Sequence, residues 1–495
     1  MKKQVLLTWI TSVLENLLFS GFVYGWANIQ PVLVKEKYFS SHCNASVNTT
    51  SAVCNRQIEL TSLVFTLSTS LGQFSCILTG YILDKLGVWT TRTILIFTIA
   101  FGFILFAVST PETSYLLLIA FPLINIGGTG TLILNHQLAG LFGALKGSYS
   151  LTSQGAANSS PIVLMVWNRL YFSGVALKTM VYFYLFFTLL LHLRTLALTP
   201  RTSVPRNLHD GYRYGYKTLS CFGYEKNKTE RGSWKDVCLK ESVESRYNLD
   251  DIGFKKSLKK SYFWTNVFGT SMICLSSSFF VSSLDVFLPL VLGNNENLVI
   301  EYTRTLGAFA FSSLIFAPLN GALLDYFCRK FKKSSCSSQA ATFKALTISF
   351  VLSNIYMIAT YTCALIPNAR LQYLTLLFSV IARTSYLGCS TFLLNSCFPA
   401  KHYGKLTGVT RAFVGLAVML QYPMIVLVTR SLNGKLTVVH VILLVVSILC
   451  LCHPTCLFKY QLNLTSLTRN RNKSVIFVKN GENVRLKDVD EKVNV

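Results

Sequence analysis

Two ionisable side chains lie in the middle of long apolar stretches of this 495-residue chain. Glu15 interrupts the first stretch and Arg383 interrupts a later one. An ionisable group at the centre of a bilayer costs about 2.5–3.5 kcal/mol on insertion scales, so each is a candidate for function. A carboxylate and a guanidinium can bind a polar ligand, share a network that closes a gate, or form an ion pair that only positions helices. The residues alone leave all three roles open.

A second chemical feature occurs twice with the same spacing. Gly80 precedes Asp84 by four residues, Gly321 precedes Asp325 by four, and basic residues follow both pairs. Glycine lets two helices approach closely, and a carboxylate can cap the N-terminus of a neighbouring helix, where the backbone dipole favours negative charge. The duplication favours paired helix contacts over two solvated turns.

Twelve apolar stretches must position these residues. The chain is 51% hydrophobic and 14% charged, against roughly a quarter charged in a soluble domain. Each stretch can cross a bilayer core, which needs about 20 helical residues, and none shows the alternation of a barrel strand. The expected fold class is therefore all-α, a polytopic membrane protein with helices near 5–30, 60–82, 93–110, 114–139, 148–170, 176–198, 263–291, 302–324, 343–366, 371–397, 404–429 and 435–458.

Basic residues set the expected orientation. The net charge is +25, but most Lys and Arg fall on one side of the predicted helices and form no stripe on a polar domain, which argues against nucleic-acid binding. By the positive-inside rule both termini are cytoplasmic. The first external loop then carries predicted glycosylation sites at Asn44 and Asn48, and it also holds Cys43 and Cys54, for which a disulfide and free thiols are both open. A third sequon, at Asn227, lies inside and should stay bare.

The helices divide into two halves. Residues 1–198 are expected to form an N-terminal six-helix bundle and residues 263–458 a C-terminal one. A cytoplasmic linker at 199–262 joins them, and a cytoplasmic tail follows at 459–495. The linker mixes many charges with Gly, Ser and Asn, so it cannot bury a core of its own.

The duplicated loops resemble the signature of the major facilitator superfamily. The first copy comprises Gly80, Asp84, Lys85, Gly87 and Arg92. A degenerate second copy comprises Gly321, Asp325 and Arg329. The resemblance implies a major facilitator fold, with two pseudo-symmetric six-helix halves that rock about a central site and gate contacts at these residues that are made and broken.

More specific motifs resemble the solute carrier 43 family. They are Leu14-Glu15-Asn16 with Gly25-Trp26, Asn135-His136-Gln137 with Leu141-Phe142-Gly143, and the stretches 309–311, 317–321, 371–375 and 398–405, together with Arg383. That family contains large neutral amino-acid transporters and an equilibrative nucleobase transporter. The total length, the short linker and the 317–321 stretch look more like the nucleobase member, whereas Glu15-Asn16 and 406–408 resemble the amino-acid members at least as well.

The resemblance also implies where substrate binds. In the superfamily fold, helices 1, 4, 7 and 10 line one central cavity, and a planar purine needs aromatic faces and amide groups on its edge. The expected substrate-binding residues are Glu15, Asn16, Tyr24, Asn135, Gln137, Arg383 and Tyr386. His136 is expected to pack rather than bind. Glu15 is the principal carboxylate available for proton coupling, a role that the residues leave open.

Catalytic and cofactor sites are not predicted. The chain has no Walker motif and no nucleophile–base arrangement, and the glycines at 127, 128 and 130 follow no strand. The Cys/His group at 450–456 fits no standard zinc spacing. We therefore expect a non-enzyme without metal or cofactor, a monomer whose partners are a small-molecule substrate and the lipid bilayer.

The resemblance thus implies a plasma-membrane uniporter for facilitated, sodium-independent diffusion of the purine nucleobases adenine, guanine and hypoxanthine by alternating access. A large neutral amino-acid uniporter is the first alternative, because a zwitterion would use Glu15 and Arg383 as charge partners. A non-transporting membrane scaffold is the second, with the basic linker and tail recruiting anionic lipid. The duplicated gate loops argue against the scaffold.

Overall fold

The computed structural model describes most of the chain outside its loops and ends. The described residues are 3–42, 55–202, 204, 214–215, 252–283, 296–334, 337–366, 368–428, 432 and 436–479. All regular elements among them are helices, which confirms the predicted all-α class. The predicted glycosylation sites Asn44 and Asn48, the Cys43 and Cys54 pair and most of the 199–262 linker lie outside the described residues.

The described helices are long and apolar enough to cross a membrane. Eight helical stretches meet that condition, and nine do so if the bent pair Lys3–Ser20 and Phe22–Lys35 counts as one crossing. Two stretches, Leu60–Val108 of 49 residues and Ser114–Phe172 of 59 residues, greatly exceed the length of one crossing, since about 20 residues suffice. Each therefore accounts for two crossings, which is consistent with the twelve predicted helices.

The first predicted helix is broken directly after Glu15. α1 (Lys3–Glu15) runs into a π-helical turn, η1 (Asn16–Ser20), then a 3₁₀ turn, η2 (Phe22–Gly25), and then α2 (Trp26–Lys35). The two arms are bent by 53°. Gly21 lies at the break, where a Cβ would come within 2.2 Å of the carbonyl oxygen of Ala157. The hydropathy pattern near 5–30 did not predict this break, because apolar content does not report backbone geometry.

Two tight reversals complete the N-terminal half. α3 (Asn55–Val108) contains the helices predicted near 60–82 and 93–110, joined at Gly87, whose φ of 83° favours glycine. A second reversal follows α4, at Gly143 with φ 50°. The remaining elements are η3 (Ser40–His42), η4 (Ser114–Leu116), α4 (Leu117–Gln137), η5 (Leu138–Leu145), α5 (Lys146–Ser159), α6 (Pro161–Phe172) and α7 (Leu177–Leu198).

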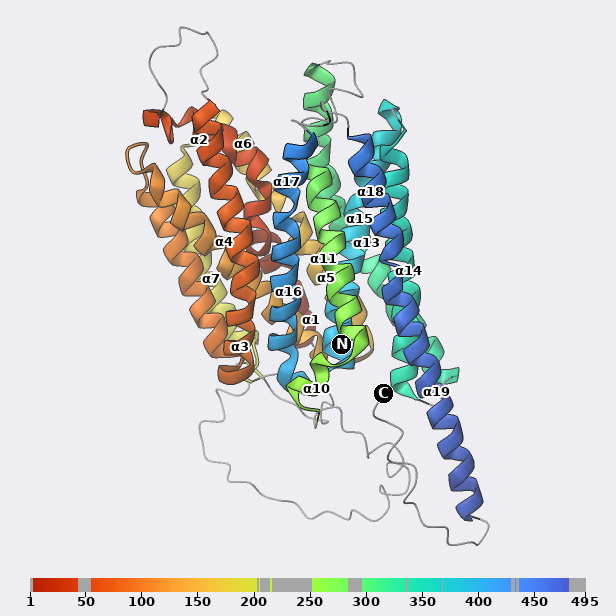
Figure 1. The fold of residues 1–495 in the computed structure, drawn as a ribbon. Helices are drawn as coiled ribbons and strands as arrows, with labels where there is room; N and C mark the ends of the chain where they lie inside the picture. Colours follow the sequence, from red (N-terminus) through yellow and green to blue (C-terminus); the bar gives the residue numbers. More distant parts are fainter. Residues whose placement is uncertain are drawn as a thin grey trace, which may run out of the picture.

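The C-terminal half contains a second set of long helices. They are α10 (Phe254–Leu258), α11 (Ser261–Ser282), α13 (Glu296–Ser334), α14 (Ser338–Ala364), α15 (Ala369–Cys397), η7 (Ala400–His402), α16 (Tyr403–Met419), α17 (Gln421–Val426), α18 (Thr437–Leu449) and α19 (Cys452–Lys479). α19 continues beyond residue 458, where the sequence analysis placed the start of a tail. Its far part lies at the same end of the molecule as α10 (Figure 1).

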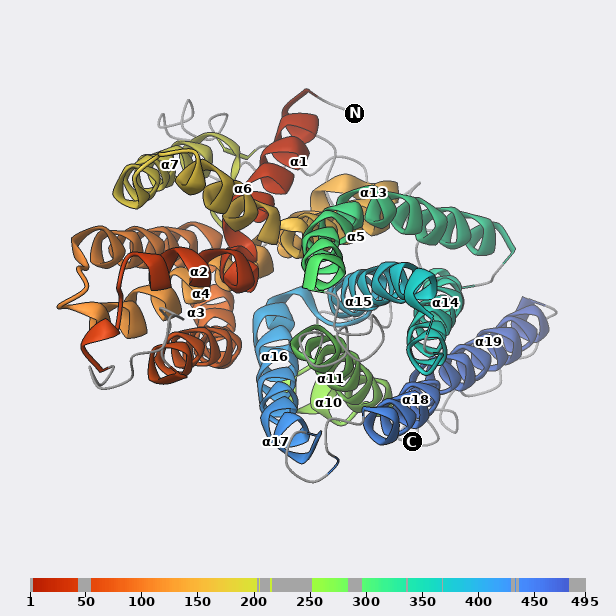
Figure 2. The same ribbon diagram turned by 90° about the horizontal axis from the view of Figure 1, so that it is seen from above.

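The two sets form separate groups of helices that meet along a central contact. Seen from above, α1 to α7 and α10 to α19 form two neighbouring lobes (Figure 2). The lobes meet where α3 packs against α16 and where α5 packs against α13 and α15. Outward-facing side chains are often large and apolar, as at Phe97 and Leu193, which are 62% and 61% exposed. Such a surface suits a lipid environment rather than water.

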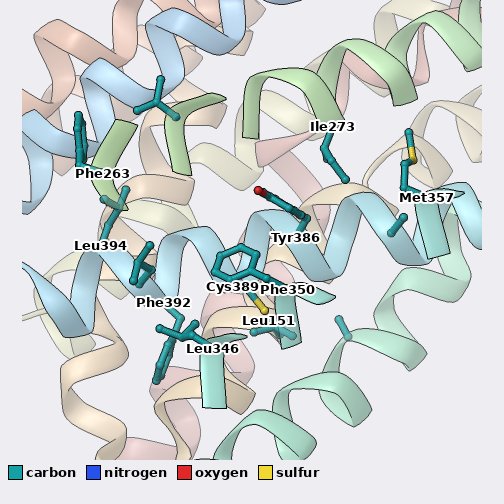
Figure 3. Close-up of a cluster of buried hydrophobic side chains, with 14 of the residues drawn as sticks. Leu151, Phe263, Ile273, Leu346, Phe350, Met357, Tyr386, Cys389, Phe392 and Leu394 are labelled. Carbon is teal, nitrogen blue, oxygen red and sulfur yellow. The ribbon is translucent and has the colours of Figure 1, made fainter. Parts of the chain in front are cut away.

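The C-terminal half has its own apolar core, and Tyr386 belongs to it. Tyr386 packs edge-on against Phe350, with ring centroids 4.8 Å apart, and is fully buried (Figure 3). Its hydroxyl also fills the space that a Cβ on Gly269 of α11 would occupy. The structure therefore places this predicted substrate-binding residue inside the core, because the face of α15 that carries it points away from the N-terminal half.

Candidate functional site

Glu15 lies in a buried ion-pair network within the N-terminal half. Its carboxylate oxygen Oε2 forms ion pairs with Arg92 on the second arm of α3 and with Arg194 on α7. Glu15 and Arg92 are 3% and 0% exposed, and Arg194 is 8% exposed. The sequence analysis considered Arg383 as the partner of Glu15. The structure gives Glu15 two partners from its own half instead.

Arg92 is not a loop residue. The sequence analysis placed it with the gate contacts, but the helix resumes after Gly87, and position 92 is therefore carried into the bundle. Its Nε donates to the Thr195 hydroxyl at 2.8 Å, and its Nη1 donates to the Asn135 side-chain oxygen at 3.4 Å. Arg92 thus ties α3 to α7 and α4 inside one half.

The predicted amides Asn16 and Asn135 complete this network. The Asn135 oxygen also accepts from Arg194 Nη1 at 3.1 Å, and the Asn135 Nδ2 donates to the Asn16 oxygen at 2.8 Å. Asn16 in turn donates to the hydroxyl of Ser153 on α5 at 2.6 Å. Both amides are fully buried and use their donors and acceptors within the half. Their geometry suits the positioning of helices rather than contact with a ligand.

Arg194 was missed by the sequence analysis. It occurs near the end of the stretch predicted at 176–198, and a basic residue near a helix end is normally credited to the water side. Arg194 Nε donates to the Thr11 hydroxyl at 3.0 Å, and its Nη2 donates to the Ser12 hydroxyl. Ser12 also accepts from the hydroxyl of Tyr149 at 3.0 Å. One sequence signal could have identified Arg194. The small polar residues on α1 are spaced so that they face α7, which indicates a polar partner on that helix.

A second group of polar side chains lies where the two halves meet. The guanidinium of Arg383 on α15 lies 5.5 Å from the ring centroid of Tyr24 in η2, and the Tyr24 hydroxyl accepts from Gln73 Nε2 at 3.0 Å. Tyr24 and Arg383, both predicted substrate-binding residues, are therefore brought together from opposite halves. The Nε of Arg383 has no hydrogen-bond partner.

Buried groups without partners continue this second group. Among the described residues, both side-chain polar atoms of Gln137 lack hydrogen-bond partners although this side chain is only 4% exposed, and the ring of the neighbouring His136 is 1% exposed. Both lie at the end of α4, and the His136 carbonyl oxygen accepts from Asn395 Nδ2 of α15 at 2.8 Å. Unpaired buried polar groups are rare and costly, and they mark places where a ligand or water completes the bonding. His136, expected to pack rather than bind, is buried beside Gln137.

Arg411 joins this group and was also missed. It lies on α16 and lines a small cavity together with Thr270, Ser390, Thr391, Thr407 and Thr410. Among the described residues, no carboxylate oxygen lies within 4.0 Å of Arg411 or Arg383. The helices that the resemblance placed around the cavity did not include this one, which is why the sequence analysis passed over Arg411.

The duplicated carboxylates each cap a helix of the opposite half. Asp84 on α3 accepts from the backbone N–H groups of Gly404 and Lys405 at 2.8 and 2.9 Å, at the start of α16. The backbones meet closely here, because a Cβ on Gly80 would lie 2.0 Å from the Gly404 carbonyl oxygen. This contact lies near α10, since the Lys405 ammonium is 5.9 Å from the ring centroid of Phe254.

The second carboxylate repeats the arrangement. Asp325 on α13 accepts from the backbone N–H groups of Gly147 and Ser148 at 2.8 Å each and from the Ser148 hydroxyl at 2.6 Å, at the start of α5. A Cβ on Gly321 would lie 2.5 Å from the Cα of Ser148. The predicted gate residues Lys85 and Arg329 are exposed and make local contacts, to Tyr81 and to the Asp325 carbonyl oxygen. The bonds that join the halves thus come from the carboxylates and not from these cations.

The Glu15 network generates a stability prediction. Glu15→Gln removes the only negative charge that the structure places within ion-pair distance of Arg92 and Arg194 in the described part of the chain. Breaking a buried pair by removing one partner costs about 3–5 kcal/mol. We expect a clearly lower unfolding midpoint for the detergent-purified variant, while Glu112→Gln, at an exposed position, stays near wild type. The double variant Glu15→Gln/Arg194→Gln should lose less than the sum of its two single variants; an unchanged midpoint for Glu15→Gln would contradict the assignment.

Comparison with known proteins places this geometry among transporters. No family model matches the chain. The chain is 27% identical over 465 residues to equilibrative nucleobase transporter 1 of Bos taurus, covering 90% of this chain and 94% of that protein. It is 23% identical over 523 residues to the large neutral amino acids transporter small subunit 3 of Homo sapiens, covering 92% and 93%.

Solved structures report on the fold. The structure superposes on the major facilitator superfamily proton:xylose symporter XylE with a TM-score of 0.58 at 15% sequence identity, covering 90% of this chain and 94% of that one. At such identity the likeness concerns the fold alone. The chain has the fold of the major facilitator superfamily, and its resemblance in sequence to the solute carrier 43 family is confirmed.

Proposed function

We propose that the chain is a plasma-membrane uniporter that moves purine nucleobases such as adenine, guanine and hypoxanthine by facilitated, sodium-independent diffusion. One observation carries the proposal. The guanidinium of Arg383 lies over the ring of Tyr24 from the opposite half, and its Nε has no hydrogen-bond partner among the described residues, as is also true of both side-chain polar atoms of the buried Gln137. An aromatic face together with amide and guanidinium groups matches a planar heterocycle with donors and acceptors on its edges. The relative named for nucleobase transport supports this substrate class.

The proposed mechanism is alternating access about this site. The carboxylates of Asp84 and Asp325 hold the halves together at the α10 end through backbone N–H groups at helix N-termini. Charge-assisted bonds of this kind are strong when made, and water replaces them when they break. Rocking of the halves would exchange these contacts for contacts at the other end and expose the substrate to the opposite side. Both termini are proposed to lie at the α10 end, in the cytoplasm.

The Glu15 network supports transport without proton coupling. Glu15 is held by two guanidiniums inside the N-terminal half. Arg92 and Arg194 belong to the same half as Glu15, so these ion pairs can persist while the halves rock. This argues for simple diffusion down the gradient of the substrate.

A large neutral amino-acid uniporter is the second candidate. The observation that favours it is the pair of guanidiniums, Arg383 and Arg411, that lack a carboxylate partner among the described residues. A guanidinium pairs well with the carboxylate of a zwitterion. The relative named for large neutral amino acids supports this candidate.

An uptake experiment separates the two candidates. Initial rates for labelled adenine, hypoxanthine and leucine are measured in cells that express the chain at their surface, with and without sodium and at two pH values. We expect saturable purine uptake that is indifferent to sodium and to pH. Uptake of leucine alone would transfer the assignment to the amino-acid candidate, and sodium-dependent purine uptake would contradict simple diffusion.

Arg383 generates a prediction about binding. Arg383→Ala removes the cationic partner of Tyr24 and a donor that has no other use in the described structure. A hydrogen bond to a charged group contributes about 1.5–3 kcal/mol, so we expect roughly a 10- to 100-fold loss of uptake at normal surface levels. Arg370→Ala, at an exposed position on the same helix, is the matched control. Unchanged uptake by well-expressed Arg383→Ala protein would remove Arg383 from the site.

The close glycine contacts generate a prediction about the gate. Gly80→Leu and Gly321→Leu each push a side chain into the backbone of a helix of the opposite half, so the halves can no longer close at the α10 end. We expect the maximal uptake rate to fall by about tenfold or more with surface expression retained. Gly253→Leu is the control, since a Cβ there meets nothing within 4 Å. Wild-type rates in Gly80→Leu would rule out this contact as part of the transport cycle.

A further inference from the structure

Arg411 lies in a pocket of hydroxyl groups contributed by three helices of the C-terminal half. Thr270 comes from α11, Ser390 and Thr391 from α15, and Thr410 from the same helix as Arg411. The protons of three of these hydroxyl groups are already used. Thr391 and Thr410 donate to carbonyl oxygens of their own helices at 2.9 Å each, and Thr270 donates to Ser390 at 3.1 Å. The guanidinium is therefore the strongest free donor in this pocket.

Arg411 also faces the N-terminal half. It lies between Gly408 and Gly415 on the face of α16 that meets α3. A Cβ on Gly408 would lie 2.7 Å from the Cys76 carbonyl oxygen, and one on Gly415 would lie 3.2 Å from the Cβ of Gln73, the residue that donates to the Tyr24 hydroxyl. At the end of α4, both side-chain polar atoms of the buried Gln137 have no hydrogen-bond partner among the described residues. A ligand between the halves can therefore bond to Arg411 with one edge and to these N-terminal groups with another. This places Arg411 at the proposed binding site rather than in the core of its half.

The chemistry of the guanidinium selects among purines. Two parallel N–H groups fit a ligand edge with two adjacent acceptors, such as the O6 and N7 of guanine or hypoxanthine. Adenine has an amino group at the first of these positions, so it presents a donor next to an acceptor and pairs instead with a carboxamide. An arginine therefore favours the 6-oxopurines, and a glutamine would favour adenine.

We propose that Arg411 is a specificity-determining residue that binds the O6/N7 edge of 6-oxopurines and makes this chain prefer them to adenine. The inference rests on the proposed nucleobase function and deepens it. Arg383 has the separate role of supporting Tyr24, with which its guanidinium is in contact.

The test compares two purines in matched variants. Initial rates over a range of concentrations give kcat/KM for labelled hypoxanthine and labelled adenine in wild type, Arg411→Gln and Arg411→Lys, corrected for surface protein. We expect wild type to favour hypoxanthine. In Arg411→Gln the hypoxanthine-to-adenine ratio should fall by about tenfold or more, as for loss of one bidentate base contact. Arg411→Lys keeps the charge but loses the paired donors, so its ratio should fall between the two.

Controls separate this inference from the proposed function. Arg370→Gln, at an exposed position on α15, should leave the ratio unchanged. A wild-type ratio in Arg411→Gln with adenine flux intact would overturn the specificity role while leaving nucleobase transport standing. Uptake of leucine and of neither purine by wild type would overturn the proposed function and this inference with it. If Arg411→Gln does not reach the cell surface, the lowered ratio in Arg411→Lys decides the question.

Discussion

The ion pairs of one carboxylate with two guanidiniums set the arrangement of the N-terminal half. Burying Glu15, Arg92 and Arg194 removes three charges from water, a cost that only close pairing and full hydrogen bonding can offset. The structure meets this condition by surrounding the guanidiniums with acceptors from several helices, including Asn135 and the hydroxyl of Ser12. Because the two guanidiniums and their acceptors lie on α1, α3, α4 and α7, satisfying the charges fixes these four helices relative to one another. The rigidity that a rocking half requires follows from this network.

The same network explains the break in the first helix. Glu15 ends α1 inside the bundle, and the π turn that follows brings Asn16 to Asn135 and Ser153. The chain then passes Ala157 at Gly21, where only hydrogen fits, and delivers Tyr24 to the contact with the other half. In an uninterrupted helix, Asn16, Gly21 and Tyr24 would lie on different faces and could not make these contacts. The position of Tyr24, and with it the proposed binding face, therefore depends on a charge nine residues earlier in the chain.

Sequence patterns predicted the position of a residue along its helix better than they predicted which face of the helix the residue occupies. The repeated Gly–Asp spacing identified both cross-half contacts, because a short backbone approach and a helix cap require those residue types. Tyr24 and Arg383 were also brought together as the resemblance implied. Glu15, by contrast, pairs with Arg92 and Arg194, and Tyr386 turns into the core. These outcomes depend on helix rotation and on a break that apolar content does not encode.

The two halves handle their buried charges in opposite ways, and this asymmetry gives the proposed transporter its chemistry. The N-terminal half neutralises its carboxylate internally and offers aromatic and neutral polar groups to the centre. The C-terminal half offers Arg383 and Arg411 without a carboxylate partner among the described residues. A half-buried guanidinium that water can reach costs far less than a fully desolvated one, so the empty site is tolerable. A substrate that replaces this water with its own acceptors is bound without any ion to accompany it. The protein would then distinguish substrates by the pattern of hydrogen-bond acceptors along their edges. Both cations belong to the C-terminal half, so their spacing stays the same while the halves move.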